Sequence, residues 1–215
     1  MPIAPTEPPR QRKERKQNAD KRRRQVLDAT YRSIVTNGLQ RTTLATVAEE
    51  AGLSQGVAVF YFKSKNGLLS EALRDLYITY ETHWQDAIDA AGTDAAARLM
   101  ALVRADFDPK ICNASILSVW FAFWGEQKFT PQYGAITSEY DDNRLRAIRD
   151  ICAHLLPADP DRAHDIADWV DTLTDGYWQN LHLFPTVYTN AGAERSTLRA
   201  LRALLPEFAD RLNPD

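Results

Sequence analysis

Residues 42–65, TTLATVAEEAGLSQGVAVFYFKSK, constrain the fold most strongly, because their pattern predicts two short helices joined by a tight turn. Thr42 or Thr43 is suited to cap a first helix whose apolar residues recur at helical spacing, and Gly52 supplies a left-handed residue to end it. Ser54 is expected to cap the second helix. This arrangement is typical of a helix-turn-helix, whose second helix enters the major groove of DNA.

The charge of the chain is divided between its two ends. Residues 1–76 contain 14 Lys and Arg against 8 Asp and Glu, a net charge of +6, whereas residues 77–215 contain 12 against 21, a net charge of −9. A basic run alone is as often a solvated surface as a binding site. Beside a helix-turn-helix, a cationic front part indicates a partner that carries phosphate.

The chain divides into three parts. Residues 1–17, with four prolines, are expected to form a disordered basic arm that can track phosphates or enter a minor groove. Residues 18–66 are predicted to form a helix-turn-helix DNA-binding domain whose first helix covers about 18–36. Residues 67–215 are predicted to form a larger helical domain for ligand binding and dimerisation.

The helices of the larger domain can be placed by their caps and prolines. A long helix is expected from Ser64 to Gly92, followed by helices at about 94–107, 114–128, 131–156, 161–184 and 194–212. Pro206 should kink or split the last of these. No segment alternates convincingly with period two, so the predicted fold class is all-α.

Several functional classes lack the residues that they need. The sequence has no phosphate-binding loop, no nucleophile placed beside a base and no cluster with metal-ligand spacing, so we expect no enzyme, cofactor or metal site. Asp141 and Asp142, beside Arg144 and Arg146, are interpreted as a solvated helical face. Cys112 and Cys152 indicate neither a disulfide framework nor a zinc site. Because no apolar segment is long enough to span a bilayer or resembles a signal peptide, a cytoplasmic protein is expected.

The stretch SVWFAFWGEQ, residues 118–127, is unusually aromatic. Trp120 and Trp124 are four residues apart and share a helix face, and Asp175 precedes Trp178 by three residues on another helix. Such a stripe most often packs in a core. The alternative is that aromatic faces and a carboxylate bind an organic cation.

The run LATVAEEAGLSQGVAVFYFKSKNGLL resembles the DNA-binding domain of TetR-family repressors, which have an A-x-x-A-G-V-S helix-turn-helix followed by Y-x-x-F-x-x-K-x-x-L-L. The motif-level resemblance covers roughly residues 20–76 and implies a homodimer bound to double-stranded operator DNA. Val59 stands where many members carry a DNA-contacting Tyr, so no contact is assigned to it. The expected DNA-binding residues are Gln55 and Val57 at bases, Thr43, Tyr61, Lys63 and Lys65 at the backbone, and Ser54 and Gly56 at the start of the reading helix.

Phe60 lies next to the polar face of the reading helix and has two open interpretations. It is either a core residue or a contact with a thymine methyl group.

One reading helix covers too few base pairs for adequate affinity, which also favours a dimer. The predicted interface lies on residues 161–184 and 194–212, with an apolar strip of Leu198, Leu201, Leu205 and Phe208.

A narrower resemblance links the chain to the choline-responsive BetI subfamily. It rests on W-x-A-F-W-x-E from Trp120 to Glu126, D-G-x-W from Asp175 to Trp178, and YF-x-x-K-x-G-L-L from Tyr61 to Leu69. It implies a repressor of choline uptake or glycine-betaine synthesis with choline or a related quaternary ammonium as effector. A regulator that senses another lipophilic cation or a hydrophobic small molecule remains an alternative, as does a DNA-binding protein without a ligand. The expected ligand-binding residues are Trp84, Trp120, Phe123, Trp124, Trp178 and, as balancing carboxylates, Glu126 and Asp175.

Overall fold

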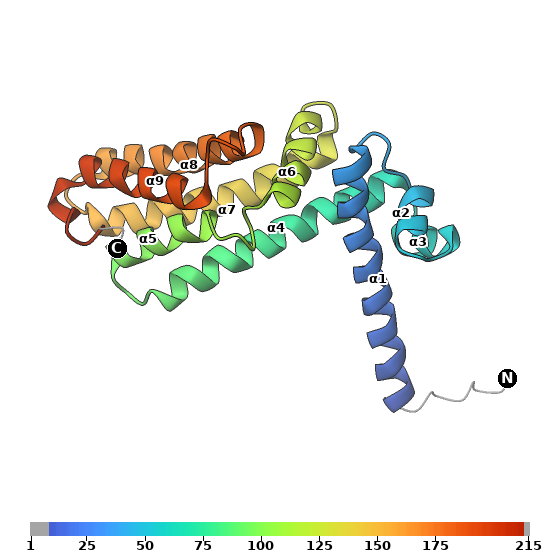
Figure 1. Ribbon diagram of the computed structural model, residues 1–215. Coiled ribbons are helices and arrows are strands. Elements are labelled where there is room, and N and C mark those ends of the chain that lie inside the picture. Colours follow the sequence, from blue (N-terminus) through green and yellow to red (C-terminus); the bar gives the residue numbers. More distant parts are fainter. Residues whose placement is uncertain (1–8, 213–215) are drawn as a thin grey trace. The chain divides into compact units, whose positions relative to one another are not determined.

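The structure is a computed structural model that describes residues 9–212 of the chain, with side chains from residue 17 onward. All regular structure in this range is helical, which confirms the predicted all-α class (Figure 1). The chain forms two compact units, one extending to Ala72 and the other beginning at Leu73. The elements are α1 (Pro9–Asn37), α2 (Leu44–Glu50), α3 (Gln55–Phe62), α4 (Lys65–Ala90), α5 (Ala95–Asp106), α6 (Ala114–Gln127), α7 (Pro131–Leu155), α8 (Pro160–Leu183), α9 (Asn190–Leu204) and the 3₁₀ turn η1 (Pro206–Phe208).

Helix α1 begins at Pro9, nine residues before the start expected at residue 18. Residues 9–17 of the expected arm are therefore helical, and residues 1–8 lie outside the described range. The physical reason is the composition after Pro9, where Gln, Arg, Lys and Glu favour a helix and no further proline interrupts it. Proline itself is compatible with the first helical position.

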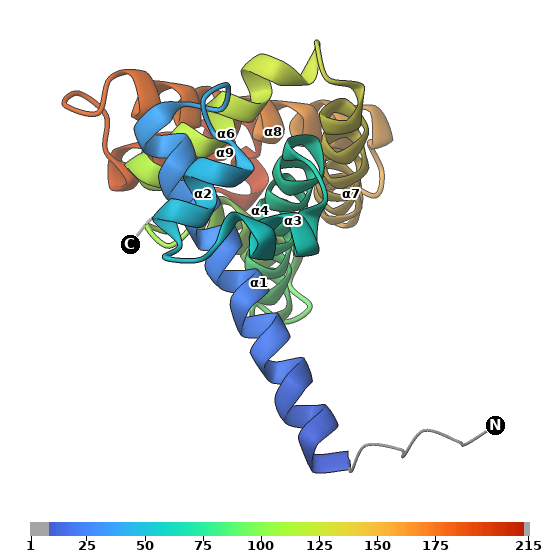
Figure 2. The same cartoon turned by 90° about the vertical axis from the view of Figure 1, so that its right-hand side faces the viewer.

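The smaller unit packs α1, α2, α3 and the start of α4 around an apolar core (Figure 2). Thr43 caps α2 in a reciprocal capping box with Thr46. At the other end of α2, Gly52 has a φ of +64°, and the backbone N–H of Leu53 donates to the carbonyl oxygen of Ala48 at 2.9 Å. This is the glycine-ended turn that the sequence predicts, and it fixes the direction in which α3 leaves α2.

The junction of α3 and α4 is unusually tight. Lys63 has a φ of +65°, and the backbone N–H of Ser64 donates to the carbonyl oxygen of Phe62 at 2.7 Å, so the chain makes a γ-turn of the rare positive-φ kind. The Ser64 hydroxyl accepts from the N–H of Gly67 at 3.0 Å, as expected of a cap. A Cβ atom on Gly67 would lie 2.3 Å from the Phe62 carbonyl oxygen, so only glycine fits this position without a shift.

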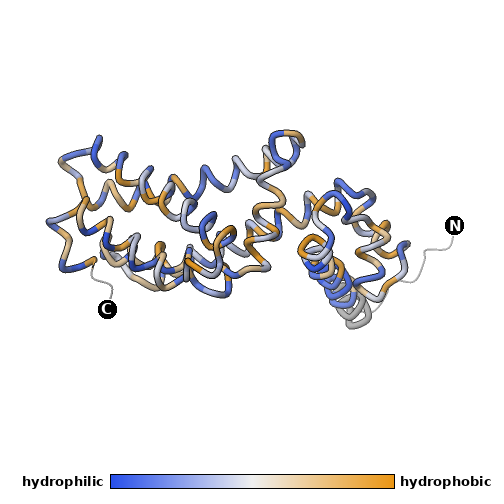
Figure 3. The backbone as a smooth tube through the Cα atoms, turned by 45° about the horizontal axis from the view of Figure 1, so that its top comes forward, coloured by the Kyte–Doolittle hydropathy of each residue, from blue (hydrophilic) through white to orange (hydrophobic). Residues whose placement is uncertain are grey.

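The larger unit is a helical bundle in which α7 lies against α5, α6 and α8, and α9 lies against α8 and α5. Orange and blue alternate along its helices in Figure 3, as expected where one face of each helix is buried. The predicted boundaries of α4 to α8 agree with the helices to within about two residues, with Asp94 and Asp159 as the caps of α5 and α8. The last helix differs, because α9 begins at Asn190 and not at the predicted residue 194. Pro206 splits the last helix as predicted, because α9 ends at Leu204 and η1 follows. None of the helices in residues 9–212 has the length and apolar character needed to cross a membrane.

Candidate DNA-reading surface and effector cavity

Helix α3 presents two faces of different character. Ala58 and Phe62 point into the core of the smaller unit, with 0% and 4% of their surfaces exposed. Gln55 and Gly56 are exposed at the start of the helix, and Val57 is half-buried. A polar side chain that can bond a base edge and an apolar side chain that can meet a thymine methyl group therefore share the outer surface.

Ser54 and Phe60 each settle an expectation about this surface. Ser54 occupies the N-cap position of α3, as predicted. Its side chain makes no capping hydrogen bond, however, and the residue is exposed, so the predicted capping contact is absent. Phe60 is 68% exposed, which rules out the core interpretation. Its ring meets Tyr61 edge-on at 5.1 Å between centroids, and the Lys63 ammonium lies 5.2 Å from the ring.

Several predicted backbone contacts already have partners within the smaller unit. The Lys65 ammonium donates to the carbonyl oxygen of Gln40 at 2.5 Å, and the Lys63 ammonium donates to the carbonyl oxygen of Phe60 at 2.7 Å. The Thr43 hydroxyl accepts from the N–H of Thr46 at 3.1 Å. Lys63 is exposed, whereas Thr43, Tyr61 and Lys65 are half-buried. A phosphate group would have to replace these internal hydrogen bonds, because the donors already have partners in the protein.

In the larger unit, three tryptophans from two helices meet around a small cavity of about 60 Å³. Trp120 and Trp124 come from α6 and Trp178 from α8, with ring centroids separated by 5.9 Å for Trp120 and Trp178 and 6.5 Å for Trp124 and Trp178. Two tyrosines of α4 complete the aromatic wall. Tyr77 lies 4.6 Å from Trp120, and Tyr80 lies 5.2 Å from Trp178.

The polar side of the cavity is organised by a buried arginine. Arg144 of α7 is 5% exposed, and its guanidinium donates to Asp106 at 2.5 Å, to Thr174 at 3.1 Å and to Asp171. The same guanidinium lies 6.0 Å from the ring centroid of Tyr80. Arg144 therefore already places a cation against both the carboxylates and an aromatic ring of this cavity.

Hydrogen bonds tie the aromatic wall to these charges. The hydroxyl of Tyr80 donates to Asp106 at 2.6 Å, and the hydroxyl of Tyr77 donates to Asp141 at 3.2 Å. The indole N–H of Trp178 donates to the backbone carbonyl oxygen of Asp106 at 2.8 Å. Helix α4 is thus joined to α5 and α7 through its two tyrosines.

The carboxyl groups of the cavity differ from ordinary aspartates in their proton affinity. Burial raises the pKa of Asp106, although Arg144 and Tyr80 oppose the rise. Desolvation raises the pKa of Asp175 to about 7, with Arg144 opposing and Asp171 adding to the rise. The pKa of Asp141 is raised to about 6, again first by desolvation. Solvent reaches the exposed side chains of Asp141 and Asp175 and moderates both shifts.

The structure brings together four of the seven ligand-binding residues expected from the sequence, namely Trp120, Trp124, Trp178 and Asp175. Phe123 instead lies on another face of α6, where it is buried edge-on against Tyr133 at 5.3 Å. Glu126 does not line the cavity, because it lies on α6 six residues after Trp120 and faces a different direction. Trp84 lies one turn beyond Tyr80 on α4 and lines a separate hollow.

Sequence reasoning missed six residues of this cavity or its network: Tyr77, Tyr80 as a cavity residue, Asp106, Asp141, Arg144 and Asp171. The interpretation of residues 141–146 as a solvated face is wrong for Arg144, which is buried, and for Asp141, which lines the cavity. Tyr77, Tyr80 and Trp84 recur at helical spacing along α4, and this periodicity was the available signal for the two tyrosines.

The prediction that an apolar strip of α9 lies at the subunit interface is also wrong. Leu198, Leu201 and Leu205 are each 0% exposed, so they pack inside their own subunit, and Phe208 is half-buried. Cys112 and Cys152 are also buried, and burial raises the pKa of each thiol to about 12. No group of three or more metal-ligating side chains occurs among the residues with described side chains.

Comparison with known proteins extends over most of the chain. Residues 26–72 match the bacterial regulatory proteins of the tetR family, and residues 95–206 match the BetI-type transcriptional repressor C-terminal domain. An HTH-type transcriptional regulator BetI of Burkholderia thailandensis is 38% identical over 162 residues, which cover 73% of this chain and 80% of the relative. The regulator of the same name from Burkholderia mallei is 36% identical over 196 residues, covering 89% and 93%.

Solved structures share the fold at lower identity. A transcriptional regulator from Pseudomonas aeruginosa aligns with a TM-score of 0.79 at 22% identity, over 90% of this chain and 95% of that one. A regulator from Saccharomonospora viridis, solved in complex with choline, aligns with a TM-score of 0.73 at 20% identity, over 85% and 96%. The matched families and relatives are regulators of transcription and not enzymes. The chain belongs to the TetR family of DNA-binding, ligand-responsive transcriptional repressors, with a C-terminal domain of the BetI type.

Proposed function

We propose that the chain is a repressor whose grip on operator DNA is released by choline or a closely related quaternary ammonium compound. The observation that carries this proposal is the joining of three tryptophans, two tyrosines and several aspartates around one cavity. Aromatic faces attract a quaternary ammonium through the ring quadrupole, and carboxylates balance its charge without requiring a hydrogen-bond donor from the ligand's cationic head. The choline complex of the Saccharomonospora viridis regulator supports the idea that this fold can hold such a ligand.

The ligand would enter as a second cation beside Arg144. The cavity of about 60 Å³ is small, so the indoles of Trp124 and Trp178 must separate to admit it. Asp175 and Asp141 balance the ligand, because Asp106 and Asp171 already bind Arg144. Two or three desolvated cation–π contacts of about 2 kcal/mol each give micromolar to millimolar affinity after ordering costs.

Tyr77 and Tyr80 provide the route by which the ligand acts on DNA binding. Both tyrosines belong to α4, whose first residues belong to the DNA-binding unit and whose later residues line the cavity. A ligand that moves these rings must alter their bonds to Asp141 and Asp106, and it thereby favours one position of α4 over another. A coupling of about 1 to 3 kcal/mol is enough to weaken operator binding several-fold or more.

The DNA-binding half of the proposal rests on α3 and its flanks. Gln55 and Val57 contact bases, Phe60 is exposed for a thymine methyl group, and Ser54 and Gly56 let the start of the helix approach the backbone closely. The remaining contacts are to phosphates. These come from Thr43, Tyr61, Lys63 and Lys65.

The protein acts as a homodimer in this proposal, since two reading helices are needed to cover two half-sites. Exposed apolar side chains on and just after α8, rather than the buried strip of α9, support an interface there. They are Trp169, Leu183 and Phe184, with 45%, 53% and 51% of their surfaces exposed. The regulated genes are those of choline uptake or glycine-betaine synthesis, and the site of action is the cytoplasm, where the operator DNA lies.

The decisive experiment compares choline with its neutral carbon isostere, in which a tert-butyl group replaces the trimethylammonium group. Tryptophan fluorescence reports binding, and fluorescence anisotropy reports release of an operator that the protein itself has selected from random DNA. Choline should quench the fluorescence and release the DNA, whereas the isostere should do neither. Equal responses to both compounds would indicate a sensor of hydrophobic small molecules, and a response to neither would remove choline as the effector.

A further inference from the structure

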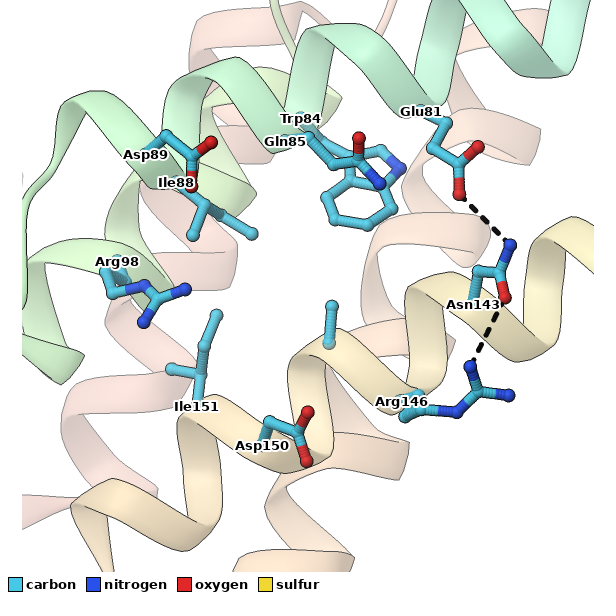
Figure 4. A pocket seen from close by; sticks show the side chains of 11 residues that line it. Glu81, Trp84, Gln85, Ile88, Asp89, Arg98, Asn143, Arg146, Asp150 and Ile151 are labelled. Carbon is cyan, nitrogen blue, oxygen red and sulfur yellow. Dashed lines mark hydrogen bonds between the residues drawn. The ribbon is translucent and has the colours of Figure 1, made fainter.

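A second hollow of the larger unit is not used by the proposed choline response. It has a volume of about 510 Å³ and lies between α4, α5 and α7 (Figure 4). Trp84 and Ile88 of α4 and Ala147 and Ile151 of α7 give it an apolar surface. Charged side chains stand around that surface, as they do in sites for small polar molecules.

Arg98 of α5 is the unusual residue of this hollow. Its side chain is half-buried, its Nε atom is buried without a hydrogen-bond partner, and the guanidinium forms no ion pair with any residue whose side chain is described. Other arginines of this unit are paired, such as Arg104 with Glu194 at 3.3 Å and Arg162 with Glu207 at 2.7 Å. A partly buried guanidinium without a partner is unfavourable, and a carboxylate is the group that its planar donors fit best.

The carboxylates around the hollow differ in whether they have a protein partner, and the two without one, Asp89 and Asp150, belong to exposed residues. Glu81 accepts from Asn143 at 3.2 Å, and Asn143 accepts from Arg146 at 3.4 Å, so these three side chains form a chain along one edge. Asp89 and Asp150 line the same hollow without a side-chain partner among the described residues. In Figure 4 Arg98 reaches into the hollow from one side, with the indole of Trp84 above and Asp150 below.

We propose that this hollow is a second small-molecule site and that it binds a zwitterion. The carboxylate of the ligand pairs with Arg98, and its cationic group lies between Trp84 and Asp150. A cation alone leaves Arg98 unpaired, and an anion alone leaves the carboxylates unbalanced. The site is therefore distinct in ligand class from the aromatic cavity, whose one arginine already forms ion pairs with Asp106 and Asp171.

The site also has a route to regulation. Trp84 and Ile88 belong to α4, the helix that contributes Tyr77 and Tyr80 to the aromatic cavity. An occupant held between α4 and Arg98 of α5 fixes the same helix from its other end. The zwitterion is then a second effector, which changes the response to the first by favouring one position of α4.

Isothermal titration calorimetry on the full chain tests the site with three matched probes: γ-aminobutyrate, butyrate and butylamine. We expect γ-aminobutyrate to bind most tightly. Arg98→Gln should weaken both carboxylate-bearing probes about tenfold or more, because a hydrogen bond to a charged group is lost. Asp150→Asn should weaken γ-aminobutyrate and leave butyrate unchanged. Arg195→Gln, which alters an exposed arginine of α9, is the matched control and should change nothing.

Each outcome decides the matter. Absence of heat with all three probes, or equal affinities in the wild type and Arg98→Gln, overturns the proposal. If circular dichroism shows that Arg98→Gln is unfolded, Arg98→Lys replaces it; this variant keeps the charge without the planar fork and should bind butyrate more weakly than the wild type. Choline should bind Arg98→Gln with wild-type affinity. If the wild-type protein does not bind choline, that result therefore counts against the proposed function and not against this site.

Discussion

Replacing Trp124 by alanine separates the aromatic cavity from the rest of the protein most cleanly. Trp124 is half-buried and lies 6.2 Å from Trp120 and 6.5 Å from Trp178 between ring centroids. Trp120 and Trp178 are 1% and 3% exposed, so their removal would create a cavity in the core. Removal of Trp124 leaves the two buried indoles in place.

The expected magnitude follows from the contact that is lost. A desolvated cation–π contact is worth about 2 kcal/mol, which corresponds to an increase of about 30-fold in the Kd for choline. The substitution should lower the free energy of unfolding by less than the roughly 3–5 kcal/mol that is lost when a fully buried aromatic residue is replaced by alanine. Operator affinity without ligand should not change, since Trp124 belongs to the other compact unit.

The assay is a choline titration by calorimetry, followed by release of operator DNA at increasing choline concentration. Phe129→Ala is the matched control, because Phe129 has 75% of its surface exposed, does not line the cavity and is not part of the proposed dimer interface. Trp124→Phe should restore most of the affinity. Wild-type affinity in Trp124→Ala, or an equal loss in Phe129→Ala, would refute the assignment of the cavity.

Four other substitutions test the DNA-binding unit and the charges of the cavity. Gly67→Ala should lower the free energy of unfolding by about 1–3 kcal/mol and abolish operator binding, because the added Cβ would lie 2.3 Å from the Phe62 carbonyl oxygen. Thermal unfolding measures the stability, and fluorescence anisotropy measures operator binding. A variant with unchanged stability and operator binding would contradict the tight junction between α3 and α4. Gln55→Ala should relax base preference at one position by about 1–3 kcal/mol, whereas Lys65→Ala should weaken all sequences alike and flatten the salt dependence, so equal effects on selected and random DNA would refute this division. The pKa of Asp175 is raised from 3.8 to about 7, so the folded state binds this proton more tightly than the unfolded chain does, and the free energy of unfolding should fall as pH rises from about 4 to 7. Choline should bind more tightly as pH rises through 7, and at lower pH its binding should release protons. Asp175→Asn should remove most of this pH dependence, as measured by calorimetry at several pH values.

Helix boundaries could be predicted because they depend on neighbouring residues. Asn113 caps α6 and Pro131 opens α7 where the sequence places them, and Gly52 ends α2 with the expected positive φ. The start of α1 could not be predicted in this way. The prolines before Pro9 suggested disorder, yet the charged residues after it favour a helix.

The cavity was predicted only in part, because periodicity gives the direction of a side chain around a helix but not its neighbour on the next helix. Trp84 shares the apolar stripe of α4 with Tyr80, yet a displacement of one helical turn, about 5.4 Å, is enough to place it in another hollow. Phe123 shows the same limit around the axis of α6. The partners Asp106 and Arg144 are 38 residues apart, and no local pattern marks such a pair.

Arg144 has a consequence for how this regulator can change over generations. Its guanidinium joins Asp106 of α5 to Asp171 and Thr174 of α8, and loss of Arg144 or of the buried Asp106 leaves a buried charge poorly compensated, at a cost of about 3–5 kcal/mol. Such single steps would consume much of the stability of a typical domain and would be removed by selection. The aromatic wall is under no comparable penalty at its half-buried member, Trp124. New effector specificities should therefore arise by exchange of aromatic side chains around an inherited ionic framework.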